Sequence, residues 1–313
     1  MKRVTHLVAA FAMSTLLFTA CKKDSSTTNP LDESETELTF QSDDQARISG
    51  ETDEVADEIN AVIETSPALQ GKSTGTQALC NATVTFDTLS NPRTATITYN
   101  GLNCIGNRSR TGVVVVSIPA GVKWKDAGAV ITVTITNLKI TRVSDGKFIT
   151  INGTKQITNV TGGRMMDLPS MGTIIHTIAS NNMTVKFDTS TQQRSWNIAR
   201  KRTFTYANNS VVISTTGNHT IGTNTKVAEW GTNRFGHPFV TSIQEPLLVR
   251  QSCQFRLTGG VVKHELVNRN LTVTFGLDAQ GNAMTTCPGS SPFYMKLVWI
   301  GPNNITYTVI RPY

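Results

Sequence analysis

Most of the chain alternates apolar and polar residues with a period of two. In residues 129–140, for example, Ile131, Val133 and Ile135 share one face while threonines occupy the other. Similar runs occur at 82–86, 94–99, 182–187, 204–214, 270–277, 294–300 and 305–310. Turn pairs such as Asn-Gly, Asp-Gly and Gly-Gly lie between them, and this pattern is typical of antiparallel strands with one buried and one wet face. We therefore predict that residues 71–313 form an all-β body, built as one antiparallel meander or as two packed β-sheets.

Two segments of this body repeat the same order of features. Residues 94–117 and 270–299 each contain a strand, a glycine-bearing turn with a cysteine, and a second apolar strand. The repetition suggests two related halves, residues 71–165 and 166–313.

The period changes in residues 43–66, which precede the body. Apolar residues recur there at helical spacing, at Ile48, Val55, Ile59, Val62 and Ile63. Acidic residues occupy the other face and Ser66-Pro67 ends the pattern, so we predict a short amphipathic helix near residues 52–64. Two interpretations stay open: the helix is a solvated spacer, or its acidic face docks on the body.

The N-terminus has the layout of an export signal. Lys2 and Arg3 precede an apolar run over residues 7–20, which is shorter than the roughly 20 residues that a bilayer-spanning helix needs. The run stops at Cys21 and resembles a bacterial lipobox, which predicts a signal peptide over 1–20 and a lipidated Cys21. A plain export signal with a chance cysteine is the alternative.

The segment after Cys21 is polar. Residues 21–42 are rich in Ser, Thr, Asp, Glu, Asn and Pro, a composition that predicts a disordered tether. We expect an outer-membrane lipoprotein that reaches the membrane through its anchor. The charged residues 22–24 favour display on the cell surface, and the periplasmic face is the alternative.

The number of cysteines fits this predicted location outside the cytosol. If Cys21 is lipidated, four cysteines remain: Cys80, Cys104, Cys253 and Cys287. They can form two disulfides in an oxidising compartment. Three pairings are possible, and we favour Cys80–Cys104 and Cys253–Cys287 because each pair brackets one local strand-turn-strand stretch. No Cys-x-x-Cys motif occurs and the five histidines are scattered, so we predict no metal site and no cofactor.

Charge is segregated along the chain, whose net charge is +7. Residues 21–70 hold 13 acidic and three basic residues, and residues 71–313 hold nine acidic and 24 basic residues. The basic body favours an anionic glycan or an acidic envelope protein as partner. Nucleic acid fits the charge but not the predicted compartment, and no nucleic-acid-binding motif occurs.

The sequence offers little for catalysis. There is no G-x-S-x-G, H-E-x-x-H or P-loop motif, and the nine carboxylates of the body are scattered. Enzyme activity is therefore not favoured. Glu229 beside Trp230 is the one acid next to an aromatic residue in a strand-like context, so a carbohydrate-active hydrolase is the alternative hypothesis.

Aromatic and basic residues give candidates for ligand binding. Trp196 and Trp230 are flanked by polar and basic residues, which predicts exposed rings that stack on sugars. The run Arg200, Lys201 and Arg202 and the acid Glu229 would complete such a face. For any single aromatic residue the alternative is packing in the core.

Several stretches of the body resemble a known family. The segment "ITYNGLNCIGNRSRTGVVVVS", followed by "DAGAVITVTITNLKI" and "INGTKQITN", is similar to a family of surface lipoproteins of Bacteroidota-type bacteria. The segment "CQFRLTGGVV", followed by "LTVTFGLDAQGNAMTTC", resembles the C-terminal section of the same family. The resemblance covers residues 80–310 and implies a β fold and an envelope address, with no activity attached. Our leading hypothesis is thus a lipid-anchored envelope protein that binds or scaffolds, with a structural envelope component as a further possibility.

Overall fold

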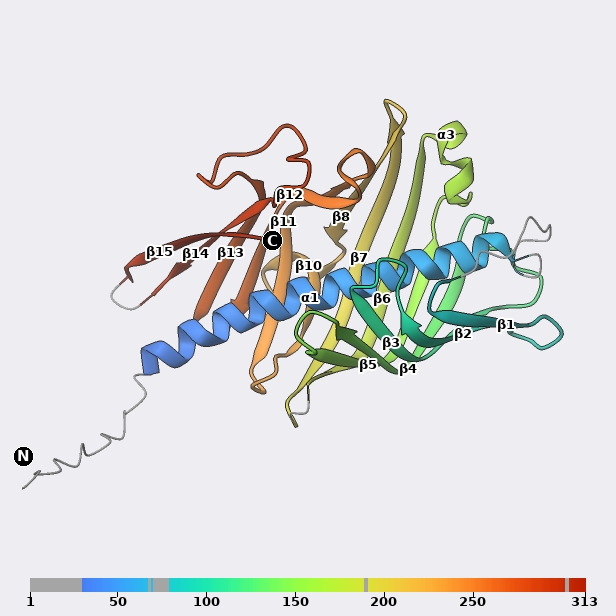
Figure 1. Ribbon diagram of the computed structural model, residues 1–313, viewed down its shortest axis with the longest axis horizontal. Coiled ribbons are helices and arrows are strands. Elements are labelled where there is room, and N and C mark those ends of the chain that lie inside the picture. Colours follow the sequence, from blue (N-terminus) through green and yellow to red (C-terminus); the bar gives the residue numbers. More distant parts are fainter. Residues whose placement is uncertain (1–29, 67–68, 70–78, 189–190, 302–303) are drawn as a thin grey trace, which may run out of the picture.

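The computed structural model describes residues 30–66, 69, 79–188, 191–301 and 304–313. The predicted signal peptide, Cys21 and residues 22–29 lie outside these ranges. Within them the chain forms one long helix and fifteen strands (Figure 1). The elements are α1 (Pro30–Thr65), β1 (Ala82–Asp87), β2 (Arg93–Leu102), β3 (Arg108–Ile118), β4 (Ala129–Arg142), β5 (Phe148–Asn159), η1 (Met165–Asp167), α3 (Leu168–Met171), β6 (Thr173–Phe187), β7 (Gln193–Ala207), β8 (Ser210–Gly217), β9 (His219–Ile221), β10 (Asn224–Thr232), β11 (Pro238–Arg250), η2 (Gln251–Cys253), β12 (Arg256–Leu266), β13 (Arg269–Leu277), β14 (Tyr294–Ile300) and β15 (Thr306–Pro312).

All fifteen described strands belong to one antiparallel sheet. The main path runs β1 to β7 in sequence order and then β10 to β15, while β8 pairs with β7 and β11 and β9 pairs with β10. The predicted all-β antiparallel fold is confirmed, and the meander describes it better than two packed sheets. Strand β5 pairs with β6 across the predicted boundary at residues 165/166, so the sheet does not divide there.

A row of β-bulges bends the sheet. The register shifts between β4 and its neighbours around Asn137, and between β6 and its neighbours around Asn182. Both asparagines have positive φ, 49° and 57°. A Cβ on Gly112 would lie 2.4 Å from the carbonyl oxygen of Asn137, so only glycine allows the strands to approach there. Because a bulge bends its strand and increases its twist, the row makes the sheet curve around α1.

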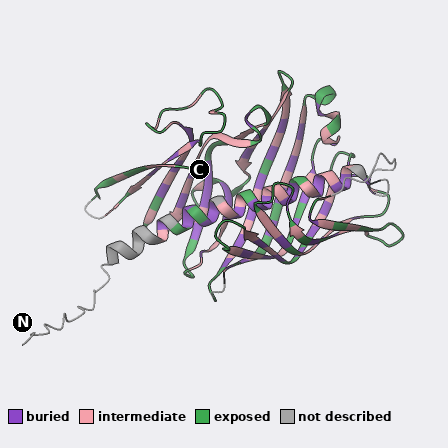
Figure 2. Cartoon of the chain, in the orientation of Figure 1, coloured by how far each residue is buried: buried purple, intermediate pink, exposed green. Residues whose placement is uncertain are grey.

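Helix α1 runs across the strands on the side toward which the sheet bends (Figure 1). The five apolar residues predicted for its buried face are 0–2% exposed and share one core with side chains of β2 to β7. Leu38 belongs to a second cluster with Leu271, Val273, Met295 and Leu297. Figure 2 shows the buried residues gathered on α1 and on the strand segments beneath it.

The helix is longer than the sequence predicted. It begins at Pro30 rather than near residue 52, so residues 30–42 of the predicted tether are helical. The physical reason is tertiary, because Leu38 is 3% exposed and packs on β13 and β14. From composition alone, residues 30–42 have too few apolar residues to form a core of their own. In the folded protein the sheet provides a surface on which Leu38 packs.

Both favoured disulfides are present. Cys80 is bonded to Cys104 and Cys253 to Cys287, with Cα–Cα distances of 5.2 and 5.4 Å. The first ties the start of the body to the β2–β3 turn, and the second ties η2 to the loop between β13 and β14. Among the helices that the structure describes, none has the length and apolar character needed to cross a membrane.

Candidate functional site

The acidic residues of α1 face cations of the sheet. Between Pro30 and Thr65 the chain carries twelve acidic residues and one basic residue. Contacts between acidic and basic side chains run along the helix from Glu37 to Glu58. They join Glu37 to His237, an ion pair only when the imidazole is protonated, Asp43 to Arg311, Asp44 to Arg234, Glu51 to Arg108, Asp53 to Arg200 and Arg202, Glu54 and Glu58 to Arg110, and Asp57 to Arg202. The interpretation that the helix docks on the basic body is therefore confirmed over the solvated spacer.

A buried polar cluster lies under the middle of the helix. Glu229 on β10 pairs with Arg200 and, at 3.5 Å, with Arg194, both on β7. Gln45 of α1 donates to Glu229 and accepts from Arg194, and Ser49 accepts from Arg200 at 3.0 Å. The side chains of Glu229 and Arg194 have no exposed surface, so an outside ligand cannot reach this cluster while α1 is docked.

The structure does not assemble the predicted sugar-binding face. Trp196 is fully buried in the main core, so the prediction of an exposed ring is wrong. Trp230 is half-buried and stacks on His219 with 4.5 Å between ring centroids. Arg200 and Arg202 are 6% exposed and point toward α1, whereas Lys201 is exposed.

The error has a physical reason. Alternate residues of a strand point to opposite faces, so Arg200 and Arg202 share a face and Lys201 has the other. The polar and basic neighbours of Trp196 in the sequence suggested a solvent-exposed surface. In the structure, Arg200 and Arg202 instead pair with acidic residues of α1. Glu229 is equally enclosed, which removes the residue on which the hydrolase hypothesis depended.

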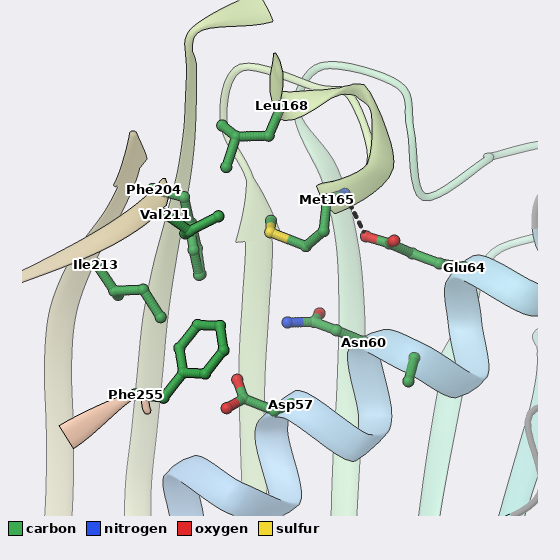
Figure 3. A pocket seen from close by; sticks show the side chains of 10 residues that line it. Asp57, Asn60, Glu64, Met165, Leu168, Phe204, Val211, Ile213 and Phe255 are labelled. Atoms are coloured by element: carbon green, nitrogen blue, oxygen red, sulfur yellow. Dashed lines mark hydrogen bonds between the residues drawn. The ribbon is translucent and has the colours of Figure 1, made fainter. Parts of the chain in front are cut away.

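A pocket opens beside the C-terminal half of α1. Its volume is about 390 Å³, and it lies between the helix, the η1–α3 turn, the β7–β8 hairpin and the turn before β12 (Figure 3). Ten described residues line it: Asp57, Asn60, Ala61, Glu64, Met165, Leu168, Phe204, Val211, Ile213 and Phe255. The sequence analysis missed this site, because its members come from four separate segments.

The walls of the pocket are apolar. Leu168, Phe204 and Ile213 belong to one buried cluster, against which Met165 and Val211 pack. Phe255 is 53% exposed and has a φ of +55°, a region that bulky residues rarely occupy. Figure 3 places its ring next to Asp57 at the side of the pocket. Such backbone conformations cost of order 1–3 kcal/mol and cluster at ligand-binding sites.

The polar groups of the pocket all come from α1. Asp57, Asn60 and Glu64 are three and four residues apart, so they project from one face of the helix. Burial raises the pKa of Asp57 to about 6, and Arg202, whose Nη1 lies 3.9 Å from Oδ1, offsets this in part. Burial raises the pKa of Glu64 to about 7, although Glu64 Oε1 accepts a 2.7 Å hydrogen bond from the backbone N–H of Met165.

Asn60 lies between the two carboxylates and points into the pocket (Figure 3). The residue is 8% exposed, and its Oδ1 has no hydrogen-bond partner. Buried acceptors of this kind are uncommon and destabilise a folded protein unless something binds them. The pocket therefore combines apolar walls with one unsatisfied acceptor and two carboxyl groups.

Comparison with protein-family models, with curated proteins and with solved structures gave no match to this chain. In the described ranges, no three His, Cys, Asp or Glu side chains are grouped in a way that could hold a metal ion. The geometry of the pocket is therefore the main indication of function.

Proposed function

We propose that this protein is a lipid-anchored component of the bacterial cell envelope that binds a small, largely apolar ligand in the pocket beside α1. The signal-like N-terminus and Cys21 in its lipobox-like context support the proposed location in the cell envelope. Two disulfides support an oxidising compartment outside the cytosol. Mass spectrometry of protein from the native host tests the address, and an unmodified Cys21 would contradict it.

The pocket carries the binding proposal. Its volume of about 390 Å³ falls within the roughly 300–1,000 Å³ of small-molecule sites. Such sites combine apolar walls with a few polar groups that orient the ligand, and this pocket has that composition. An anionic glycan is not the proposed ligand, because both ionisable groups in the pocket are acidic.

Binding is favoured over hydrolysis. Asp57 and Glu64 are seven residues, about two turns, apart on one helix, so both carboxyl groups come from the same wall of the pocket. A glycosidase holds its two carboxyl groups on either side of the scissile bond, about 5–9.5 Å apart. Two acids on a single wall of a pocket do not flank a bond in this way.

Filling the pocket tests the proposal. Val211 lines the cavity, so Val211→Trp should occupy its volume, whereas Val143→Trp adds the same ring at an exposed turn. We expect a neutral solvatochromic dye such as Nile red to bind the full-length protein and the Val143→Trp variant. Val211→Trp should weaken dye binding at least tenfold. Equal dye binding by both variants would refute the pocket as the binding site.

A further inference from the structure

Two carboxyl groups and one amide line the pocket. Asp57 and Glu64 contribute carboxyl groups, and the Oδ1 of Asn60 is a buried acceptor without a partner. Figure 3 shows the Asn60 side chain directed into the cavity, between the two acids. A ligand that satisfies the two carboxylates and this oxygen must therefore bring hydrogen-bond donors.

The described lining of the pocket contains no cation. None of the ten described lining residues is basic. Arg202 lies closer to Asp53, at 2.6 Å, than to Asp57, at 3.9 Å. Arg164 lies 2.8 Å from Asp167. Asp57 is exposed and has only the shared Arg202, and half-buried Glu64 forms no ion pair within the described residues, so the acidic wall favours a positively charged guest.

We propose that the pocket binds a primary amine carried on an apolar body, with the ammonium group held by Asp57, Asn60 and Glu64. An ammonium group has three N–H donors and no acceptor, so it can bond to the carboxylates and to the Oδ1 of Asn60, whose amide would turn its oxygen toward the ligand. The hydrocarbon part would lie against Phe204, Ile213 and Leu168. This inference rests on the proposed function, because it names the class of ligand for the same pocket.

The inference has a pH signature. Asp57 is faced by Arg202 from β7 and by Asp53, Glu54 and Glu58 from its own helix; Glu64 is faced by Arg164 and Asp167 and by the N–H groups of Met165 and Met166. With pKa values of about 6 and about 7, both acids gain protons as the pH falls from 8 to 5. Amine binding should weaken over this range, since a protonated carboxyl group attracts an ammonium group less.

Calorimetric titration of the full-length protein with three probes of equal chain length tests the inference. Octylamine is cationic, octanol is neutral and octanoate is anionic. At pH 8 we expect octylamine to bind at least tenfold more tightly than octanol, and octanoate to bind most weakly. Lowering the pH to 5 should remove the preference for the amine.

Matched variants locate the effect. Glu64→Gln and Asn60→Leu should each reduce the preference for octylamine over octanol while octanol still binds. Asp43→Asn removes a carboxylate from the far end of the same helix, where it pairs with Arg311, and should leave the preference unchanged. Because each variant is compared by its octanol affinity, a folding defect is recognised as loss of both ligands.

The outcomes separate the two proposals. Octanol binding equal to or tighter than octylamine, together with intact dye binding, would refute the amine and leave the apolar pocket standing. Loss of all probes, Nile red included, would refute both. A lipid amine and a free amine share this chemistry, so vesicles containing phosphatidylethanolamine form a second arm, and amine-selective binding in either arm supports the inference.

Discussion

Arg110 of β3 is a buried cation that pairs with two acids of α1. Its side chain has no exposed surface, and its two Nη atoms lie 2.7 Å from Glu54 Oε2 and 2.7 Å from Glu58 Oε1. Tyr99 adds to the cluster, because its hydroxyl donates to Glu58 Oε2 at 2.6 Å. Arg110→Met keeps much of the side-chain volume but removes the charge.

The expected cost follows from what the substitution leaves behind. Removing one partner of a buried ion pair typically costs about 3–5 kcal/mol, because the other charge stays buried and unpaired. Glu54 is 41% exposed and can turn toward water, whereas Glu58 is 18% exposed and cannot do so without losing Tyr99. We therefore expect about 3 kcal/mol, near the lower end, which is roughly a 150-fold change in the opening equilibrium of the helix.

Hydrogen exchange measured by mass spectrometry on peptides covering residues 48–63 reports that opening. Amide exchange in these peptides should become roughly 150-fold faster in Arg110→Met. Arg142 provides the matched control, because it is 37% exposed and its partner Asp145 is 36% exposed. Loss of such a surface pair costs about 0–1 kcal/mol, so Arg142→Met should change exchange less than about fivefold.

A second substitution separates the lost pair from general damage to the fold. Adding Glu58→Gln to Arg110→Met removes the unpaired charge and should restore part of the protection. Exchange within threefold of the parent protein in Arg110→Met would refute the idea that this arginine holds the helix. No rescue by Glu58→Gln would show that the lost volume of the arginine, rather than the orphaned acid, causes the opening.

Three further predictions follow from burial, cross-linking and titration. Trp196→Ala should destabilise the protein by about 3–5 kcal/mol, as truncation of a core aromatic does, and a urea-unfolding midpoint close to the parent value would contradict its place in the core. Replacing both Cys80 and Cys104 by alanine opens a loop with a sequence separation of 24, which the chain-entropy model values at about 3.5 kcal/mol in the same assay. Burial lowers the pKa of His176 to about 4 and of His264 to about 3, with Arg202 and Arg194 respectively acting in the same direction. The unfolded chain then protonates its histidines first below pH 6.5, so their contribution to stability is level above that pH and falls between pH 6.5 and 4, while the raised pKa values of Asp57 and Glu64 act in the opposite direction. His264→Gln should therefore lower stability less at pH 4 than at pH 7 relative to the parent protein, and an equal loss at both pH values would contradict the assignment.

The sequence predicted the features that local information determines. The alternation over residues 129–140 places a strand where the structure has β4, Ala129–Arg142. The cysteine pairs followed from the expectation that each closes one strand-turn-strand stretch, and both are found. In each case the interacting residues are close in the sequence, so a short stretch of sequence is enough to predict the strand or the disulfide.

Features that depend on distant partners were missed. The first turns of α1 are helical because Leu38 packs against Leu271 and Val273, more than 230 residues away in the sequence. Trp196 was predicted to be exposed because of its charged neighbours, yet Arg200 and Arg202 pair with acids of α1. The pocket joins residues between 57 and 255, and no local pattern in the sequence marks them as neighbours.

The charges along α1 give the strongest reason to regard the pocket as a binding site. From Asp43 to Glu54, every acid forms an ion pair with an arginine of the sheet. The pairing weakens at the pocket, where Asp57 lies 3.9 Å from a shared arginine and Glu64 forms no ion pair within the described residues. If the acids of α1 served only for docking, the sheet would be expected to carry cations opposite Asp57 and Glu64, as it does opposite the acids from Asp43 to Glu54. The change in pattern coincides with a cavity and with the unsatisfied Oδ1 of Asn60, so we infer that the missing cation belongs to the ligand.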